Sequence, residues 1–480
     1  MNHAEICPEE ARRERILIIG SGGREHALAA AFAADPDVAA VFAAPGSDGM
    51  ADIAKCLPLN WRKPAPLADW ALANAVTLVV IGPEEPLANG LTDYLRERGL
   101  TVFAPTRAAA RIEWDKNWAK ELMTRAGVPT ARYAAFDEAD AALEYLETVD
   151  LPIVVKVNRL FAGKGVTVTD DLATAQSAVR AACAGYDAAQ AGMPAVVIEE
   201  CLEGPEFSLI SLVDGDRFCP LAVAQDYKRA YDGDRGPNTG GMGACSPVPV
   251  ISEAHVAAAI ETIVRPTVRA LIEHDAAFTG FLYAGLMLTA DGIKVIEFNS
   301  RMGDPEAQVI LPRLESGLSG LIRALLDGST PTAHWSTDYA VGVVLASQGY
   351  PQGPLRTGSI TIAEPLEGRL YHMSTARAAA LTGDATASDA PTASSTNDPT
   401  DSPTDDSTNA STSTPTSAPT KTTTDTPSPD RYWRSTGGRS IICVGRGPTL
   451  AAARAAAYRD VGRIRSDVLF YRRDIGSHAE

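Results

Sequence analysis

A hairpin-forming stretch over residues 281–308 constrains the fold of this chain more than any other feature. An apolar run and the run that starts at Ile293 predict two strands, joined by the polar link TADG. Side chains alternate along a strand, so we expect three polar residues on one face. These are Glu297, Asn299 and Arg301, and the other face should carry Ile296 and Phe298. Carboxylate and amide oxygens suit Mg²⁺ and a guanidinium holds anionic oxygens, which favours a nucleoside triphosphate site; the alternative is a solvent-facing strand with ordinary ion pairs.

Length and charge limit the class of protein. The 480 residues exceed what one core supports and predict about three or four domains. A formal charge of −17 argues against a general nucleic-acid or membrane-surface binder. The seven cysteines are scattered without a C-x-x-C pair, which favours reduced thiols. With no signal-peptide pattern and no apolar run of membrane-spanning length, we expect a cytoplasmic protein without a membrane partner.

The first region reads as a parallel α/β unit. The strand RILIIG runs into the turn SGGREH and an Ala-rich helix, a geometry that suits an anion. A dinucleotide-binding fingerprint fails because Glu25 takes the third glycine position, and because residues 38–44 end without a ribose-binding acid. Later strands run into GPEEPL, which contains Glu84, and into APT. The alternation of strands and helices predicts a Rossmann-like parallel sheet, with a ligand-binding site at the edge where the strands run into these loops.

Three further segments carry groups that suit phosphates or an acidic substrate. Residues 115–126 read as a helix with Lys116 near its start, and the strand PIVVKVN carries Lys156. The following loop has glycines and a lysine that could close over a triphosphate, but its spacing is not that of a Walker A loop. The loop GPNTGGMG is rich in glycine and has few side chains, so its backbone can approach a ligand closely.

Read in order, several motifs resemble the glycinamide ribonucleotide synthetase (phosphoribosylamine-glycine ligase) family. They are GSGGREHALA, PGSDG, GPEEPL, GKGV, VVIEECLEG, GPNTGGMGACSP, YAGLM, VIEFNSRMGDPEAQVILPRL and RRDIG, and they cover nearly the whole chain. The resemblance implies an ATP-grasp fold and ligation of glycine to 5-phosphoribosylamine. In that reaction ATP phosphorylates glycine, and the amine attacks the glycyl phosphate, which gives the second step of purine biosynthesis.

The resemblance also implies roles for residues. Mg²⁺ or Mn²⁺ would be held by Glu297 and Asn299, and the catalytic residues would be Arg301, Lys228 and Asp304. ATP would be bound by Lys116, Lys156, Gly163, Lys164, Gly165, Glu199, Glu200, Leu202 and Glu206. The other substrates would be bound by Gly22, Gly23, Glu84, Asp226, Arg229, Asn238, Gly240, Gly241, Met242 and Gly243. We expect a monomer whose partners are these small molecules.

The chain departs from the family pattern near the predicted mobile loop. The family's KADGLAAGKGV is KVNRLFAGKGV here, so Asn158, Arg159 and Phe161 replace Asp, Gly and Ala, and Tyr227 replaces the His of DHKR. These changes leave two alternatives open. One is an ATP-grasp carboxylate-amine ligase with a changed substrate, and the other is a degenerate nucleotide-binding regulator.

The predicted fold class is α/β, or α+β for the chain overall, with a small β-rich C-terminal domain. The predicted domain ranges are 12–114 (Rossmann-like), 115–203 (small ATP-grasp subdomain with the mobile loop), 204–330 (large ATP-grasp subdomain) and 338–478 (C-terminal). Residues 386–430 are rich in Thr, Ser, Pro and Asp and have no apolar residue larger than Ala. Such a composition cannot bury enough surface to offset backbone ordering, so we expect a disordered insertion within a hairpin.

Overall fold

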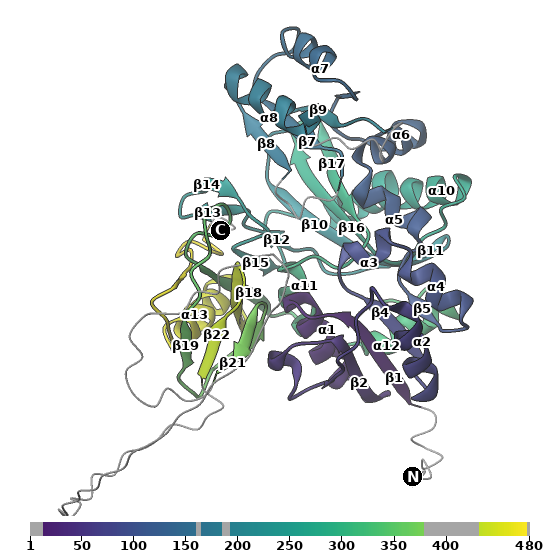
Figure 1. Ribbon diagram of the computed structural model, residues 1–480, viewed down its shortest axis with the longest axis vertical. Coiled ribbons are helices and arrows are strands. Elements are labelled where there is room, and N and C mark those ends of the chain that lie inside the picture. The colour runs from purple at the N-terminus through teal and green to yellow at the C-terminus, as the bar shows by residue number, and fades with distance from the viewer. Residues whose placement is uncertain (1–12, 160–164, 185–192, 379–431, 478–480) are drawn as a thin grey trace, which may run out of the picture.

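The computed structural model describes residues 13–159, 165–184, 193–378 and 432–477. Gly163 and Lys164 of the predicted mobile loop lie outside the described residues, as does the predicted insertion. In Figure 1 the N-terminal sheet and the C-terminal sheets lie at one end, and α7 (Ala139–Leu146) and α8 (Leu172–Ala184) lie at the other. No described helix is long and apolar enough to cross a membrane.

A parallel sheet with strand order β3-β2-β1-β4-β5 forms the N-terminal region, as predicted. Ile16 and Ile18 of β1 lie in the core on one face, whereas Leu17 and Ile19 lie in the core on the other. Both faces are therefore buried, which explains the uninterrupted apolar run. The elements are β1 (Glu14–Gly20), β2 (Val38–Pro45), β3 (Lys55–Cys56), β4 (Leu78–Ile81) and β5 (Val102–Phe103), with helices α1 (Gly23–Ala33) and α2 (Pro64–Ala73).

Two antiparallel sheets make up the middle of the chain, with orders β6-β9-β7-β8 and β11-β10-β16-β17. Helices α6 (Lys116–Ala126) and α10 (Arg265–Glu273) contribute to the core of the second sheet. The strands of the first sheet are β6 (Tyr133–Phe136), β7 (Ile153–Val157), β8 (Val166–Thr169) and β9 (Val196–Glu200). Those of the second are β10 (Glu206–Asp214), β11 (Arg217–Pro220), β16 (Thr279–Thr289) and β17 (Gly292–Asn299).

The predicted hairpin is β16 and β17, with Thr289 opposite Gly292 at its turn. The expected strict alternation is wrong at Ile296, because the register shifts there and Val295 and Phe298 both lie in the core. The bulge leaves the polar face intact, since Glu297 and Asn299 follow it as alternate residues on the side away from Phe298.

The C-terminal region contains a sheet in which strands from the glycine-rich segment take part. Its order is β12-β15-β18-β23-β20, with β25 (Leu469–Phe470) also on β18. The strands are β12 (Gln225–Asp226), β15 (Gly243–Ser246), β18 (Tyr339–Ser347), β20 (Arg369–His372) and β23 (Arg439–Gly447), and α13 (Leu450–Val461) packs against β23. A further sheet has the order β21-β22-β19-β24, in which β19 is Ser359–Ile362 and β24 is Ile464–Arg465. There, β21 (Thr375–Arg377) pairs antiparallel with β22 (Tyr432–Ser435), and the predicted insertion falls between these two strands.

Two buried histidines join the N-terminal and C-terminal regions. The backbone N–H of His372 donates to Nδ1 of His26 over 3.0 Å, and the two rings stack with centroids 5.9 Å apart. Burial lowers the pKa of His26 to about 4 and that of His372 to about 3. Both imidazoles are therefore neutral in the folded protein at neutral pH.

We expect the free energy of unfolding to fall as the pH drops from 6.5 towards 4. Below its ordinary pKa of 6.5, each histidine binds a proton in the unfolded chain before it does so in the fold. Each pH unit in this window should cost about 1.4 kcal/mol per histidine. Urea unfolding of the wild type and of His26→Gln at pH 7 and pH 5 measures the effect. An equal pH-dependent loss in both proteins would contradict it.

Candidate active site

Four cationic side chains act on the carboxylate of Glu297 at the end of β17. Burial raises the pKa of this carboxyl, but the charges of Lys228, Lys156, Lys116 and Arg301 outweigh burial and hold the pKa below its ordinary value. These cations come from four different segments of the chain. The arrangement keeps Glu297 ionised, and the same positive charges can bind further anionic oxygens.

Glu297 and Asn299 have the chemistry of a divalent-cation site. Among the described residues, no group of three or more His, Cys, Asp or Glu could hold a metal ion. Two protein oxygens are nevertheless enough for Mg²⁺ or Mn²⁺, because such ions commonly keep waters and take the remaining ligands from phosphates. The residues present therefore fit the implied cation.

A buried ion-pair network fixes Lys156. Its Nζ donates to the carbonyl of Ile296 over 2.8 Å and lies 2.9 Å from a carboxylate oxygen of Glu199. The other oxygen of Glu199 lies 2.9 Å from Nζ of Lys120, which also donates to Thr130. Glu199, which the resemblance assigns to ATP binding, thus pairs with two lysines. Sequence reasoning missed Lys120, although its place one helical turn after Lys116 on α6 was an available signal.

Arg301 lies between two acids from the N-terminal half of the chain. Its Nη2 lies 3.0 Å from Glu113 and its Nε lies 3.5 Å from Glu84. Glu113 also accepts from the backbone N–H and hydroxyl of Ser300, over 2.8 and 2.7 Å. The sequence offered no signal for Glu113, because nothing in its spacing links it to Arg301. Burial alone would lower the pKa of the guanidinium, but the charges of the two acids outweigh burial and raise the pKa above its ordinary value. The two acids also hold the guanidinium in place.

Lys228 and Asp226 also interact electrostatically with Glu297. The Nζ of Lys228 is 2.6 Å from a carboxylate oxygen of Glu206, which the resemblance assigns to ATP binding. Burial raises the pKa of Asp226 to about 7, with Lys228 opposing that rise and Glu306 among the acids that add to it. Asp226 can therefore exchange a proton near neutral pH.

The glycine-rich loop is tied to Asp304 by an arginine that sequence reasoning missed. Arg439 of β23 donates through Nη1 to the carbonyls of Gly240 (2.5 Å) and Asp304 (2.7 Å), and its Nη2 lies 3.2 Å from the Asp304 carboxylate. Tyr350 accepts from the N–H of Gly240 over 2.9 Å. At Gly241, which has φ +106°, a Cβ would lie 2.5 Å from Pro305, so glycine is required. Met242 and Gly243 continue the loop into β15, where Met242 donates to the carbonyl of Tyr227.

The first glycine turn is occupied by a side chain of the protein. Glu25 folds back so that its Oε2 accepts from the N–H of Gly22 over 2.6 Å, and its Oε1 accepts from Arg24 over 2.7 Å. This explains why the dinucleotide fingerprint fails at Glu25. A Cβ at Gly23 would lie 2.6 Å from the side chain of Gln308. This glycine therefore allows α1 to pack closely against Gln308, which donates a hydrogen bond to Asp304.

The remaining predicted residues lie outside this central group of contacts. Glu200 pairs with Arg132 at 2.6 Å, and Arg229 donates to Gly236 within its own hairpin. Asn238 is the cross-strand partner of Arg229, Leu202 is half-buried just after β9, and Gly165 accepts from the N–H of Val157.

Asn158, which stands where the family has Asp, is fully hydrogen-bonded. Its Nδ2 donates to Asp115 over 3.2 Å and to the carbonyl of Pro194 over 2.9 Å, and its Oδ1 accepts from the N–H of Asn117 over 3.1 Å. Two acceptors therefore face the Nδ2 group. An amide suits this position, because a carboxylate would meet the carboxylate of Asp115.

We expect Asn158→Asp, the family residue, to destabilise the protein by about 1–3 kcal/mol, because both acceptors would lose their donor. Urea unfolding measures the loss. The double variant with Asp115→Ser should recover most of it, since serine keeps the N-cap that Asp115 provides to Trp118 of α6. Equal stability of Asn158→Asp and wild type would contradict the account.

Family models and curated relatives match most of the chain. The Phosphoribosylglycinamide synthetase N domain matches residues 14–113, its ATP-grasp (A) domain 114–307 and its C domain 340–478. A phosphoribosylamine–glycine ligase of Halalkalibacterium halodurans is 41% identical over 468 residues, which are 97% of each chain. One of Pseudomonas aeruginosa is 43% identical over 469 residues, 97% of this chain and 98% of that protein.

Solved structures agree with the sequence matches. The phosphoribosylamine–glycine ligase of Thermotoga maritima has a TM-score of 0.74 at 30% identity, over 96% of this chain and all of that one (100%). A biotin carboxylase of Campylobacter jejuni has a TM-score of 0.61 at 13% identity, over 96% of this chain and 94% of that one, which shows a shared fold alone. The ATP-grasp fold predicted from the sequence is confirmed.

Proposed function

Because the chain belongs to the phosphoribosylglycinamide synthetase family, we propose that it joins glycine to 5-phosphoribosylamine at the expense of ATP. The products are glycinamide ribonucleotide, ADP and phosphate, and the reaction is a step of purine biosynthesis. The observation that carries this proposal is the set of four cations around Glu297 and Asn299.

The first half-reaction transfers the γ-phosphoryl group of ATP to the glycine carboxylate. A divalent cation, which we propose to be Mg²⁺ or Mn²⁺ held by Glu297 and Asn299, supplies charge neutralisation for the phosphates. Lys156, fixed by Glu199 and the carbonyl of Ile296, is positioned to bind phosphate oxygens, and Lys116 lies close enough to act on Glu297. Positioning and electrostatics suffice for this step, since phosphoryl transfer needs no protein nucleophile.

The second half-reaction is attack of the 5-phosphoribosylamine nitrogen on the glycyl phosphate. Arg301, held by Glu113 and Glu84, would stabilise the charge that develops on the acyl phosphate. Asp304 and the loop of Gly240 and Gly241, fixed by Arg439, would bind the amine substrate and glycine. Lys228 and Asp226 both interact electrostatically with Glu297 and would orient the reacting groups.

The proposal is tested by ADP release from purified protein with Mg²⁺ and ATP. Glycine and freshly generated 5-phosphoribosylamine are added separately and together, and we expect sustained release only with both. Chelation of the divalent cation should abolish release, and Mn²⁺ in place of Mg²⁺ should restore it. Release with other acids or amines but not with this pair would indicate a changed substrate. Bound ATP without any release would indicate a nucleotide-binding regulator.

A further inference from the structure

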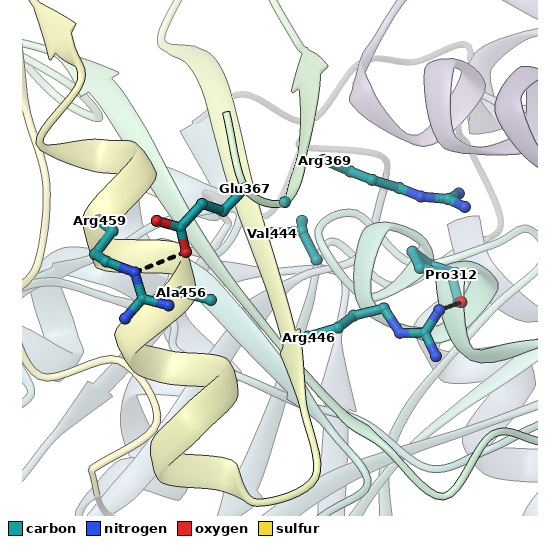
Figure 2. A pocket seen from close by; sticks show the side chains of 8 residues that line it. Pro312, Glu367, Arg369, Val444, Arg446, Ala456 and Arg459 are labelled. Carbon is teal, nitrogen blue, oxygen red and sulfur yellow. Dashed lines mark hydrogen bonds and ion pairs between the residues drawn. The ribbon is translucent and has the colours of Figure 1, made fainter. Parts of the chain in front are cut away.

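A polar cavity lies in the C-terminal region, outside the candidate active site (Figure 2). Its volume is about 420 Å³, which falls within the range of roughly 300–1,000 Å³ typical of small-molecule sites. Three arginines line it, from β20, β23 and α13: Arg369, Arg446 and Arg459. The lining includes no aromatic ring, and its apolar members, such as Pro312 and Val444, are few.

Strand register brings two of the arginines to one face of the sheet. Arg369 of β20 is opposite Val444 of β23, and Arg446 follows two residues later on β23. Alternate residues share a face, so both side chains leave the sheet on the side of Val444. In Figure 2 both guanidinium groups lie near Pro312, on the side of the cavity away from the pair formed by Glu367 and Arg459.

The nearby acids pair with Arg459 and Arg446 but leave Arg369 without an ion-pair partner among the described residues. Glu367, the acid that lines the cavity, lies 2.8 Å from Arg459 and 3.8 Å from Arg463. Within residues 13–159, 165–184, 193–378 and 432–477, no carboxylate lies within ion-pair distance of Arg369. Arg446 lies 3.1 Å from Asp338 and donates to the carbonyl of Pro312 over 2.9 Å and to Ser336 over 2.8 Å, so that only its buried Nε lacks an acceptor in those ranges.

Arginines are concentrated at this cavity although the chain as a whole carries a formal charge of −17. Burial and, after it, the positive charge of Arg446 together lower the pKa of the neighbouring Arg313 to about 10. Crowded guanidinium groups with an unused N–H donor are stabilised when an anion binds between them.

We infer that this cavity binds a small phosphate-bearing anion, at a site separate from the active site. Guanidinium groups match phosphate oxygens in a bidentate geometry, and the lack of an aromatic or extended apolar wall disfavours recognition of a nucleobase. The separation follows from β23 itself, because Arg439 at the active site precedes Arg446 by seven residues, about 23 Å along a strand.

The experiment measures binding of radiolabelled inorganic phosphate by equilibrium dialysis, with the ATP site filled by Mg²⁺ and a non-hydrolysable ATP analogue. Arg369→Ala should weaken phosphate binding at the cavity by about tenfold or more, because a charge-assisted contact is lost. Arg369→Lys keeps the charge but not the planar guanidinium fork, so its affinity for phosphate should lie between those of the wild type and Arg369→Ala. The matched control is Arg465→Ala, an exposed arginine of β24 (Ile464–Arg465) outside the cavity, and it should bind phosphate like the wild type. Arg369→Ala should release ADP at the wild-type rate.

Competitors then identify the source of the phosphate group. Displacement by ribose 5-phosphate at lower concentration than by phosphate would assign a phosphorylated metabolite, and displacement at equal concentration would assign free phosphate. Displacement by citrate as effective as by phosphate would overturn the phosphate assignment. Equal phosphate binding by the wild type and a folded Arg369→Ala would overturn the site itself.

Discussion

Arg301→Ala is expected to lower kcat for ADP release by roughly 10²–10³-fold, the usual cost of removing one preorganised donor to a developing charge. Glu113 and Glu84 hold the guanidinium in place before substrates bind, so its loss removes a preorganised donor. Initial rates with both substrates and Mg²⁺-ATP measure the effect.

The pattern of the loss is the informative readout for Arg301. A group that acts mainly in the transition state lowers kcat and kcat/KM together, whereas a group that only binds substrate raises KM. Arg301→Lys should recover part of the rate, because it keeps the charge without the planar fork. Arg265→Ala, which removes an arginine paired with Glu261 on the surface, serves as the control and should leave kcat unchanged. A rise in KM alone for Arg301→Ala would contradict the assigned role.

Glu199→Gln is expected to destabilise the protein by about 3–5 kcal/mol, the usual cost of breaking a buried ion pair from one side. The Glu199 side chain is 3% exposed and balances Lys120 and Lys156, which are themselves 2% and 5% exposed. Glutamine would leave two buried ammonium groups with no carboxylate between them. Urea unfolding measures the loss.

The adjacent residue provides a matched control for Glu199. Glu200→Gln changes the same chemistry one position along β9, where the partner Arg132 is 89% exposed, and should cost less than about 1 kcal/mol. Glu199→Gln should also weaken ATP binding, because Lys156 would lose the group that orients it. Equal stability losses in the two variants would show that the buried network contributes no more than a surface pair.

Local patterns predicted most of the fold. The apolar run of β1 and the two-residue turn between β16 and β17 each depend on neighbouring residues, so periodicity and turn chemistry revealed them. The bulge at Ile296 was not predictable from the sequence, because it depends on the register in which β16 pairs with β17. Pairing of β15 with β18 was equally hidden, since it joins residues about a hundred positions apart.

The site was predictable where one motif carries several groups, as with Glu297, Asn299 and Arg301. It was not predictable where a partner comes from a distant segment. Glu113 and Arg439 each contact a motif residue more than a hundred positions away, and neither has local spacing that indicates the contact. The contact of Glu25 with Gly22 is different, because it spans only three residues at the start of α1.

Pairing of Gly243–Ser246 with Ala340–Val343 has a consequence for how the protein can be divided. A truncation after α12 (Leu318–Leu326) would remove β18 and leave β15 as an edge strand with unpaired N–H and C=O groups. It would also remove Arg439, which fixes Gly240 and Asp304. A shortened protein would therefore expose an aggregation-prone edge beside a loosened substrate loop, so we expect the ATP-grasp portion to need the C-terminal portion for stable folding.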